Sequence, residues 1–242
     1  MQTFSDPVLI GADTPRCRAY AAAIAYSGMG PVRGIFYAGR ASRRERYPAE
    51  GDVIGGIWYP PVFDSTADIF SRNGWEQQWI EAATINEEAV GKALRQTHAP
   101  FAIFAGKPGE IVSSDTLSLG IPLLHLHPGA LPAQRGSTTI YYSILGKKPV
   151  SVSSLLLAPD IDAGPVLDVR EYPAPLPGID VDVHFDNAIR SDALVHMLAR
   201  YRQEGQLPPP LPGRPGEGEL YYIVHPLLKH IALLSISSPL NT

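Results

Sequence analysis

The sequence contains a single cysteine, Cys17, among its 242 residues. One cysteine excludes an internal disulfide framework and a metal site built from cysteines, and it suits a reducing compartment. Long apolar runs are also absent, because none reaches the roughly 18 residues that a membrane-spanning helix needs. The amino terminus has no basic segment leading into an apolar stretch. We therefore expect a cytoplasmic protein that does not enter a membrane.

The sequence also lacks a large excess of either positive or negative charge. Lys and Arg number 20 and Asp and Glu number 24, which gives a formal net charge of -4. Without an excess of positive charge the chain cannot hold phosphate backbones over a wide face, so we expect no nucleic-acid partner. The one basic cluster consists of Arg40, Arg43, Arg44 and Arg46, and we interpret it as a solvated loop, with a contact for an anionic substrate as the alternative.

Apolar segments and helical patterns alternate along the chain. Strands are predicted at 7–11, 32–37, 101–104, 121–126 and 150–157, with a short strand within 53–59 between loops that extend over 40–71. Helices are predicted after Asp13 or Thr14, after Asn86, after Ser137 or Thr138, and from about 180 to 202. This alternation indicates an α/β fold with a mostly parallel, twisted sheet and helices on both faces.

A stretch rich in proline and glycine follows the last long helix. Residues 207–218 include three successive prolines and several glycines, a composition that forms neither a helix nor a central strand. We therefore predict a main domain over 1–204, and a connector with a short C-terminal extension over 205–242. The final apolar segment, 220–234, is expected to pack back on the main domain and to complete either a substrate pocket or a homodimer contact.

The most informative segment is 124–136, which reads Leu-His-Leu-His-Pro-Gly-Ala-Leu-Pro-Ala-Gln-Arg-Gly. His125 and His127 stand two apart at the end of a predicted strand, and strand side chains alternate between faces, so both imidazoles point the same way. Open α/β sheets bind ligands beyond the carboxyl ends of their strands, which is where this pair falls. A second polar turn, 158–165, follows the next strand and supplies Asp160, Asp162 and Gly164.

Together these two segments resemble the folate-dependent formyltransferase family, which includes glycinamide ribonucleotide, methionyl-tRNA and sugar-nucleotide formyltransferases. The resemblance rests on His-Pro-Gly-Ala-Leu-Pro-Ala-Gln-Arg-Gly at 127–136 and Asp-Ile-Asp-Ala-Gly-Pro at 160–165, in the family's order and spacing. It extends over residues 7–172 and weakens toward the start of the chain. It implies a Rossmann-like formyltransferase fold in which 1–204 is the catalytic domain.

The resemblance also implies three catalytic residues. The family motif reads Asn-x-His-Pro followed by Asp-x-Gly, so His127 matches its His and Asp162 matches its Asp. His125 stands where the family has Asn, which is thought to donate a hydrogen bond to the formyl oxygen as negative charge develops there. The implied role of His127 is hydrogen-bond donor and proton relay, and an interaction with Asp162 is expected to raise its pKa toward neutrality or above.

The resemblance further implies that the formyl donor is 10-formyltetrahydrofolate, and it implies no metal. Residues expected to contact the donor are Ala105, Gly106, Lys107, Ile111, Asp160 and Gly164. Residues expected to contact the acceptor are Gly11, Asp13, Arg135 and Gly136. The turn at 11–13 lies at a helix amino terminus, where relatives hold a phosphate, although Asp13 also fits a plain capping role.

The predicted function is transfer of a formyl group to the amine of a small molecule, either an amino sugar or an amino acid. Methionyl-tRNA is disfavoured as acceptor, because the net charge is negative and a sizeable basic RNA-binding domain does not fit after the main domain. Three alternatives stay open. In the first, His125 positions a water molecule and the protein is a formyltetrahydrofolate hydrolase. In the second, His125, His127 and Asp162 hold a catalytic metal ion. In the third, the protein binds ligands without catalysing a reaction.

Overall fold

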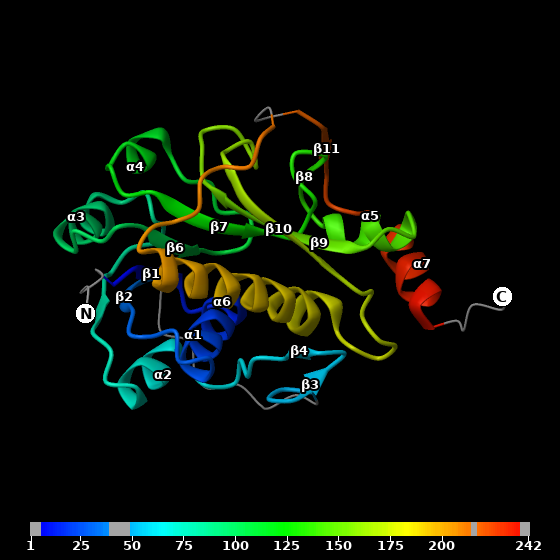
Figure 1. Ribbon diagram of the computed structural model, residues 1–242, viewed down its shortest axis with the longest axis horizontal. Helices are drawn as coiled ribbons and strands as arrows, with labels where there is room; N and C mark the ends of the chain where they lie inside the picture. The colour runs from blue at the N-terminus through cyan, green and yellow to red at the C-terminus, as the bar shows by residue number, and fades with distance from the viewer. Residues whose placement is uncertain (1–5, 39–48, 214–216, 238–242) are drawn as a thin grey trace.

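A seven-stranded sheet forms the centre of the protein, in a computed structural model that describes residues 6–38, 49–213 and 217–237 (Figure 1). The strand order is β10-β9-β7-β6-β1-β2-β5. The strands are β1 (Val8–Ala12), β2 (Arg33–Tyr37), β5 (Gln77–Trp79), β6 (Ala102–Ala105), β7 (Leu123–His127), β9 (Val150–Leu156) and β10 (Val166–Tyr172). Pairs from β5 to β7 are parallel, whereas β9 runs antiparallel to both β7 and β10. The predicted mostly parallel sheet is confirmed.

Helices cover both faces of this sheet, as expected. They are α1 (Pro15–Tyr26), α2 (Thr66–Arg72), α3 (Glu88–Gln96), α4 (Ser114–Leu117), α5 (Thr139–Leu145), the π-helical turn η1 (Val181–Phe185), α6 (Asp186–Glu204) and α7 (Pro226–Ser237). Alternate residues of the strands point to opposite faces of the sheet and belong to two separate hydrophobic cores. Leu9 and Leu124 pack with α1 and α6, whereas Ile10 and Leu123 pack with α3. Burial on both faces explains why these strands read as continuous apolar runs.

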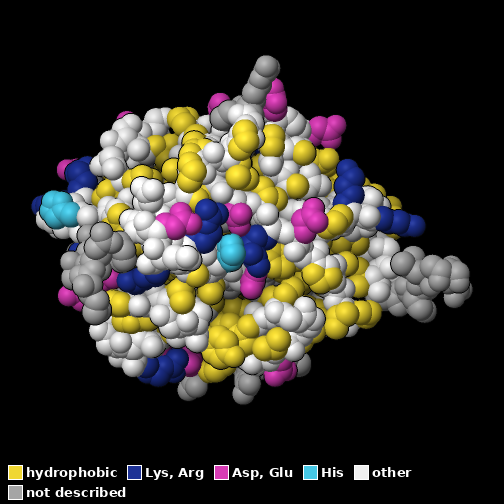
Figure 2. All heavy atoms as spheres, in the orientation of Figure 1, with side chains coloured by type: hydrophobic (Ala, Val, Ile, Leu, Met, Phe, Trp, Pro, Cys, Tyr) yellow, Lys and Arg dark blue, Asp and Glu magenta, His cyan; other side chains and the backbone are white. Residues whose placement is uncertain are grey.

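The outer surface of α6 is polar, in contrast to its buried side. Arg170 pairs with Asp192 and Arg200 with Glu204 on the solvent side of this helix. Figure 2 shows charged side chains gathered across the middle of this face, over α6 and β10. Among the described residues, no helix combines the length and the apolar composition that crossing a membrane requires.

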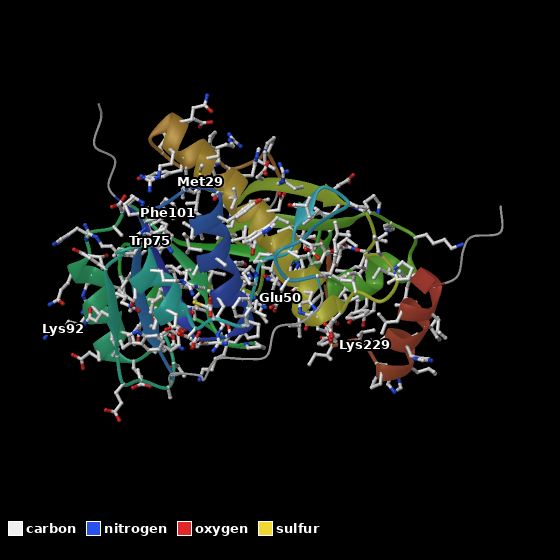
Figure 3. The ribbon with its side chains drawn as sticks, turned by 90° about the horizontal axis from the view of Figure 1, so that it is seen from below. Met29, Glu50, Trp75, Lys92, Phe101 and Lys229 are labelled. Carbon is white, nitrogen blue, oxygen red and sulfur yellow. The ribbon has the colours of Figure 1, made fainter. Side chains whose placement is uncertain are left out.

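Two small sheets complete the fold. β3 (Val53–Ile54) and β4 (Ile57–Trp58) form a hairpin within the segment expected to contain one short strand. β8 (Gln134–Gly136) pairs in parallel with β11 (Glu219–Tyr221) from the C-terminal extension, which therefore packs back on the main domain. After β11 the chain forms α7, which packs against α5. Figure 3 shows α7, with Lys229, at the opposite end of the molecule from α3, with Lys92.

Several sequence predictions about local structure are wrong. The segment 66–72, expected as loop, is helix α2, because Ser65 caps it and accepts a hydrogen bond from Asp68 N. Asn86 does not cap α3, whose first turn follows Glu87; its side chain binds the backbone of Ile111 and Ser113 instead. Strands β5 and β10 were not expected. The basic cluster at 40–46 lies outside the described residues.

Candidate active site

The two histidines of β7 and the carboxylate of Asp162 converge at the carboxyl end of the sheet. His125, His127 and Asp162 each offer one ligand atom, and these atoms lie within 4.8 Å of one another. The closest approach is 3.3 Å, between Nδ1 of His127 and Oδ2 of Asp162. The structure therefore brings together the three side chains that were expected to be catalytic.

His127 is fixed in one orientation by the turn that follows it. Its Nε2 lies 2.7 Å from the backbone oxygen of Gln134. A carbonyl oxygen only accepts, so Nε2 carries the proton and Nδ1 is the atom that faces Asp162. Gly129 leaves room for this contact, because a Cβ there would lie 2.6 Å from His127 Nε2. Ser153 ties the turn to β9 by donating to Gly129 O at 2.6 Å.

Asp162 is held from the opposite side by β8. The backbone N–H of Gly136 donates to Asp162 Oδ2 at 2.8 Å, and Arg135 Nε donates to the oxygen of Ile161 at 2.9 Å. Asp162 itself has a φ of 49°, a left-handed backbone that costs energy for a residue with a side chain. Arg135 and Gly136, expected to contact the acceptor, thus position the Asp162 turn.

His125 and Asp162 line a cavity of about 130 Å³, together with apolar side chains from three segments. Its wall consists of Phe104, Glu110, Ile111, Val112, His125, Leu157, Ala158, Pro159, Asp160, Ile161 and Asp162. His127 is only 2% exposed and lies behind these two side chains, away from the cavity surface. Of the two imidazoles, that of His125 lines the cavity and that of His127 does not.

The loop after β6 is organised by the partly buried carboxylate of Glu110, whose contacts the sequence analysis missed. Tyr37 Oη and Lys107 N each donate to Glu110 Oε2 at 2.8 Å. At Gly106 a Cβ would come within 2.4 Å of the same oxygen. Gly106 and Lys107 therefore shape the cavity from behind, whereas Ile111 lines it directly and is 60% exposed.

Besides Gly106, Lys107, Arg135 and Gly136, four more of the expected binding residues do not line this cavity. Asp13 is buried and accepts from Arg18 Nε at 2.8 Å and from Thr66 Oγ1 at 2.8 Å, so its carboxylate is already satisfied. Asp13 was expected either to contact the acceptor or to cap α1, but it forms an internal ion pair with Arg18. The residue that caps α1 is Thr14. Gly11 and Ala105 are packed against each other between β1 and β6. Gly164 lines a neighbouring cavity with Leu131 and Pro210.

Burial lowers the pKa of both histidines. The pKa of His125 lies well below 6.5, because burial disfavours its charged form and the charges of Arg190 and Arg16 act in the same direction. The pKa of His127 is also lowered, since burial outweighs the opposing effect of Asp162. The expectation that Asp162 would raise the pKa of His127 to neutrality or above is wrong, and both rings are neutral at pH 7.

Arg190 is a second residue of the site that the sequence analysis missed. Its guanidinium donates to the oxygen of Leu126, the residue between the two histidines, and to Asp186 Oδ1 at 2.7 Å. Arg190 thus links α6 to the end of β7. The available signal was the Asp186–Arg190 pair, whose two residues stand four positions apart on α6.

Acidification is expected to destabilise the fold through these histidines. As the pH falls below 6.5, an unfolded chain protonates both rings whereas the folded chain does not, so the free energy of unfolding decreases toward the lowered pKa values. Each ring contributes at most about 1.4 kcal/mol per pH unit. Urea unfolding at pH 7, 6 and 5 measures this slope.

Replacing His125 with Asn should make that slope shallower, because one of the two titrating rings is removed. The matched control is His98→Asn, since His98 is exposed and has a φ of 49°, which Asn tolerates. Equal slopes for wild type and His125→Asn would contradict the assignment of a lowered pKa to His125.

The sequence is similar to curated methionyl-tRNA formyltransferases, although no family model matches it. It is 32% identical to the Thermus thermophilus enzyme over 147 residues, which are 59% of this chain and 45% of that protein. The chain thus spans about half the length of the curated relatives it matches.

Solved structures show the same fold. A sugar N-formyltransferase from a Shewanella species superimposes with a TM-score of 0.58 at 19% identity, covering 98% of this chain and 90% of that one. A 4-N formyltransferase from Francisella tularensis superimposes with a TM-score of 0.56 at 12% identity, covering 99% and 91%.

Proposed function

We propose that this chain, which resembles curated methionyl-tRNA formyltransferases in sequence and a solved sugar N-formyltransferase in fold, transfers a formyl group from 10-formyltetrahydrofolate to the amine of a small molecule. The observation that carries this proposal is the pairing of Asp162 with His127, directly behind a cavity at the carboxyl end of β7. Formyl transfer needs a proton acceptor for the attacking amine and a hydrogen-bond donor for the oxyanion that forms. Two of the three side chains, His125 and Asp162, line this cavity, and His127 contacts Asp162.

The proton acceptor is the pair formed by Asp162 and His127. Asp162 lines the cavity, and the neutral ring of His127 presents its basic Nδ1 to the carboxylate at 3.3 Å. A proton that leaves the amine during attack is taken up by this pair and returned to the leaving nitrogen of the folate. The hydrogen bond from His127 to Gln134 O keeps the ring oriented for this exchange.

His125 is the hydrogen-bond donor for the formyl oxygen. A neutral imidazole has one N–H, and the lowered pKa of His125 keeps the ring in that form at pH 7. Its position at the cavity wall supports this role, and the family motif that the sequence resembles has Asn at the same position. A neutral donor also avoids placing a positive charge beside Arg190.

The cavity fits one end of the donor. Its volume of about 130 Å³ is below the roughly 300–1,000 Å³ of sites that enclose a whole drug-sized ligand. Phe104, Val112 and Leu157 offer an apolar wall for a flat ring, and Asp160 offers a carboxylate near the rim. We assign the formyl-bearing end of the folate to this cavity, with the remainder of the molecule outside it.

The acceptor is a small amine, of the amino-sugar or amino-acid class, and no nucleic acid. A formal charge of -4 gives tRNA no favourable field. Two solved structures that superimpose over nine-tenths or more of each chain are named as a sugar N-formyltransferase and a 4-N formyltransferase. Incubating the protein with 10-formyltetrahydrofolate and panels of amino sugars, nucleotide-linked amino sugars and amino acids tests this assignment.

Mass spectrometry of those mixtures distinguishes the outcomes. An N-formylated product together with stoichiometric tetrahydrofolate is the expected result. Release of free formate at the same rate with and without any amine would identify a hydrolase instead. Absence of donor turnover with every amine class would contradict the proposal.

Variants of His125 are expected to show whether its contribution is the hydrogen bond that it donates or another property of the imidazole ring. His125→Asn keeps an N–H donor at this position and should retain kcat within about tenfold of wild type, whereas His125→Ala should lower kcat by roughly 10²- to 10³-fold, as for removal of an oxyanion donor. Steady-state kinetics on the best acceptor measures both. Similar losses in the two variants would show that hydrogen-bond donation is not what His125 contributes.

A further inference from the structure

The facing atoms of His127 and Asp162 both offer lone pairs, so the space between them favours a positively charged group. Nε2 of His127 carries the ring proton, because its neighbour at 2.7 Å is the carbonyl oxygen of Gln134. Nδ1 of the neutral ring then presents a lone pair to Asp162 Oδ2 at 3.3 Å, and a carboxylate oxygen also offers only lone pairs. Two acceptors that face each other repel unless a proton or a metal ion lies between them.

His125 offers a third atom with a lone pair beside the other two. Nδ1 of His125 is buried and has no hydrogen-bond partner, and a buried polar atom without a partner is costly. Within the described ranges, His125, His127 and Asp162 are the one group of three or more His, Cys, Asp or Glu side chains close enough to share an ion.

We propose that His125, His127 and Asp162 bind a divalent transition-metal ion, and that zinc(II) fits the site best. Two imidazoles and one carboxylate are a ligand set that zinc uses with one position left open. Zinc bonds of about 2.0–2.1 Å at tetrahedral angles place neighbouring ligand atoms about 3.3–3.4 Å apart. The Nδ1–Oδ2 separation of 3.3 Å already meets this requirement. His125 closes on the ion by a side-chain movement on the order of 1 Å.

The surroundings of these ligands also suit a metal. Ligating histidines usually donate their other ring N–H to a carbonyl or a carboxylate, as His127 does to Gln134. Ligating carboxylates are in turn hydrogen-bonded, as Asp162 is to Gly136 N at 2.8 Å. The fourth position of the ion faces the cavity, because His125 and Asp162 both line it.

Two positive side chains limit the affinity. Arg190 and Arg16 lie close enough to act electrostatically on His125, although Arg190 is paired with Asp186 at 2.7 Å. We therefore expect micromolar binding, weaker than at zinc sites with four protein ligands. The ion takes the same Nδ1 and carboxylate that the proposed transfer uses for its proton, so zinc and formyl transfer exclude each other.

Calorimetric titration of zinc chloride into the metal-free protein tests the site without any formyl substrate. One ion per chain is expected for wild type, with binding at least tenfold weaker in His125→Asn and in Asp162→Asn. The control His98→Asn makes the same substitution at an exposed histidine and should bind zinc as wild type does. Circular dichroism verifies that each variant is folded.

Cobalt(II) supplies a second readout, because visible absorption reports whether the ion is bound in tetrahedral geometry. Wild type should give that spectrum, and Asp162→Asn should not. The site is refuted if wild type shows no saturable zinc binding, or if both ligand variants bind zinc as tightly as wild type.

Formyl transfer assayed in EDTA separates this inference from the proposed function. Transfer in EDTA by a protein that binds no zinc refutes the metal site alone. Zinc binding by a protein that transfers formyl to no amine supports the metal site and counts against the proposed function.

Discussion

Replacing His127 with Gln is expected to lower kcat of formyl transfer by roughly 10²- to 10⁴-fold, the range attributed to a positioned acid–base group. The amide of Gln can still donate to the backbone oxygen of Gln134, the contact that now holds the ring at 2.7 Å. It has no basic nitrogen to face Asp162. The variant therefore removes the proton acceptor while retaining most of the packing, and KM should change little.

Steady-state kinetics with the amine identified above measures this effect, and His196→Gln on α6 is the matched control. His196 is half-buried on a helix outside the cavity, so its variant should keep wild-type kcat. If His127→Gln retains kcat within threefold, proton transfer does not pass through this ring. A melting temperature close to that of wild type is needed for either conclusion.

Replacing Gly164 with Ala is expected to damage both stability and activity. A Cβ at this position would lie 1.8 Å from the backbone oxygen of Leu156, a contact that only a backbone shift can relieve. Gly164 follows Asp162 by two residues, so the shift should move the carboxylate of Asp162, to which we assign the proton transfer. A misplacement of about 1 Å costs on the order of 10²-fold in rate, and we expect roughly 2–4 kcal/mol of lost stability.

Urea denaturation and kcat measurements at saturating substrate detect the two effects separately. Gly213→Ala is the control, because a Cβ there has no heavy atom within 4 Å. A Gly164→Ala variant with wild-type stability and rate would show that the turn around Asp162 tolerates displacement. The requirement for glycine in the Asp-x-Gly pattern would then have another origin.

The main strands were predictable because they are buried on both faces. The segments 7–11, 101–104 and 121–126 are apolar at nearly every position, and each corresponds to a strand of the central sheet. The shared direction of His125 and His127 followed from the period of a strand. Their convergence with Asp162 was anticipated because adjacent strands end at the same edge of an open sheet.

Long-range polar contacts were beyond the reach of sequence patterns. The partners of Asp13 include Thr66, and those of Glu110 include Tyr37, residues separated by 53 and 73 positions. No local period links such residues. The lowered pKa of His127 was missed for a related reason, because burial of the ring depends on the packed turn as well as on the neighbouring carboxylate.

The pairing of β11 with β8 ties the end of the chain to the proposed chemistry. Gly136, whose N–H holds Asp162, lies in β8 beside Tyr221, and a Cβ on Gly136 would meet the oxygen of Tyr221 at 2.1 Å. The C-terminal extension is thus an integral part of the scaffold that positions Asp162. A chimera that exchanges this tail between relatives must graft β8 and β11 together, since a mismatched pair would reposition the carboxylate from more than fifty residues away.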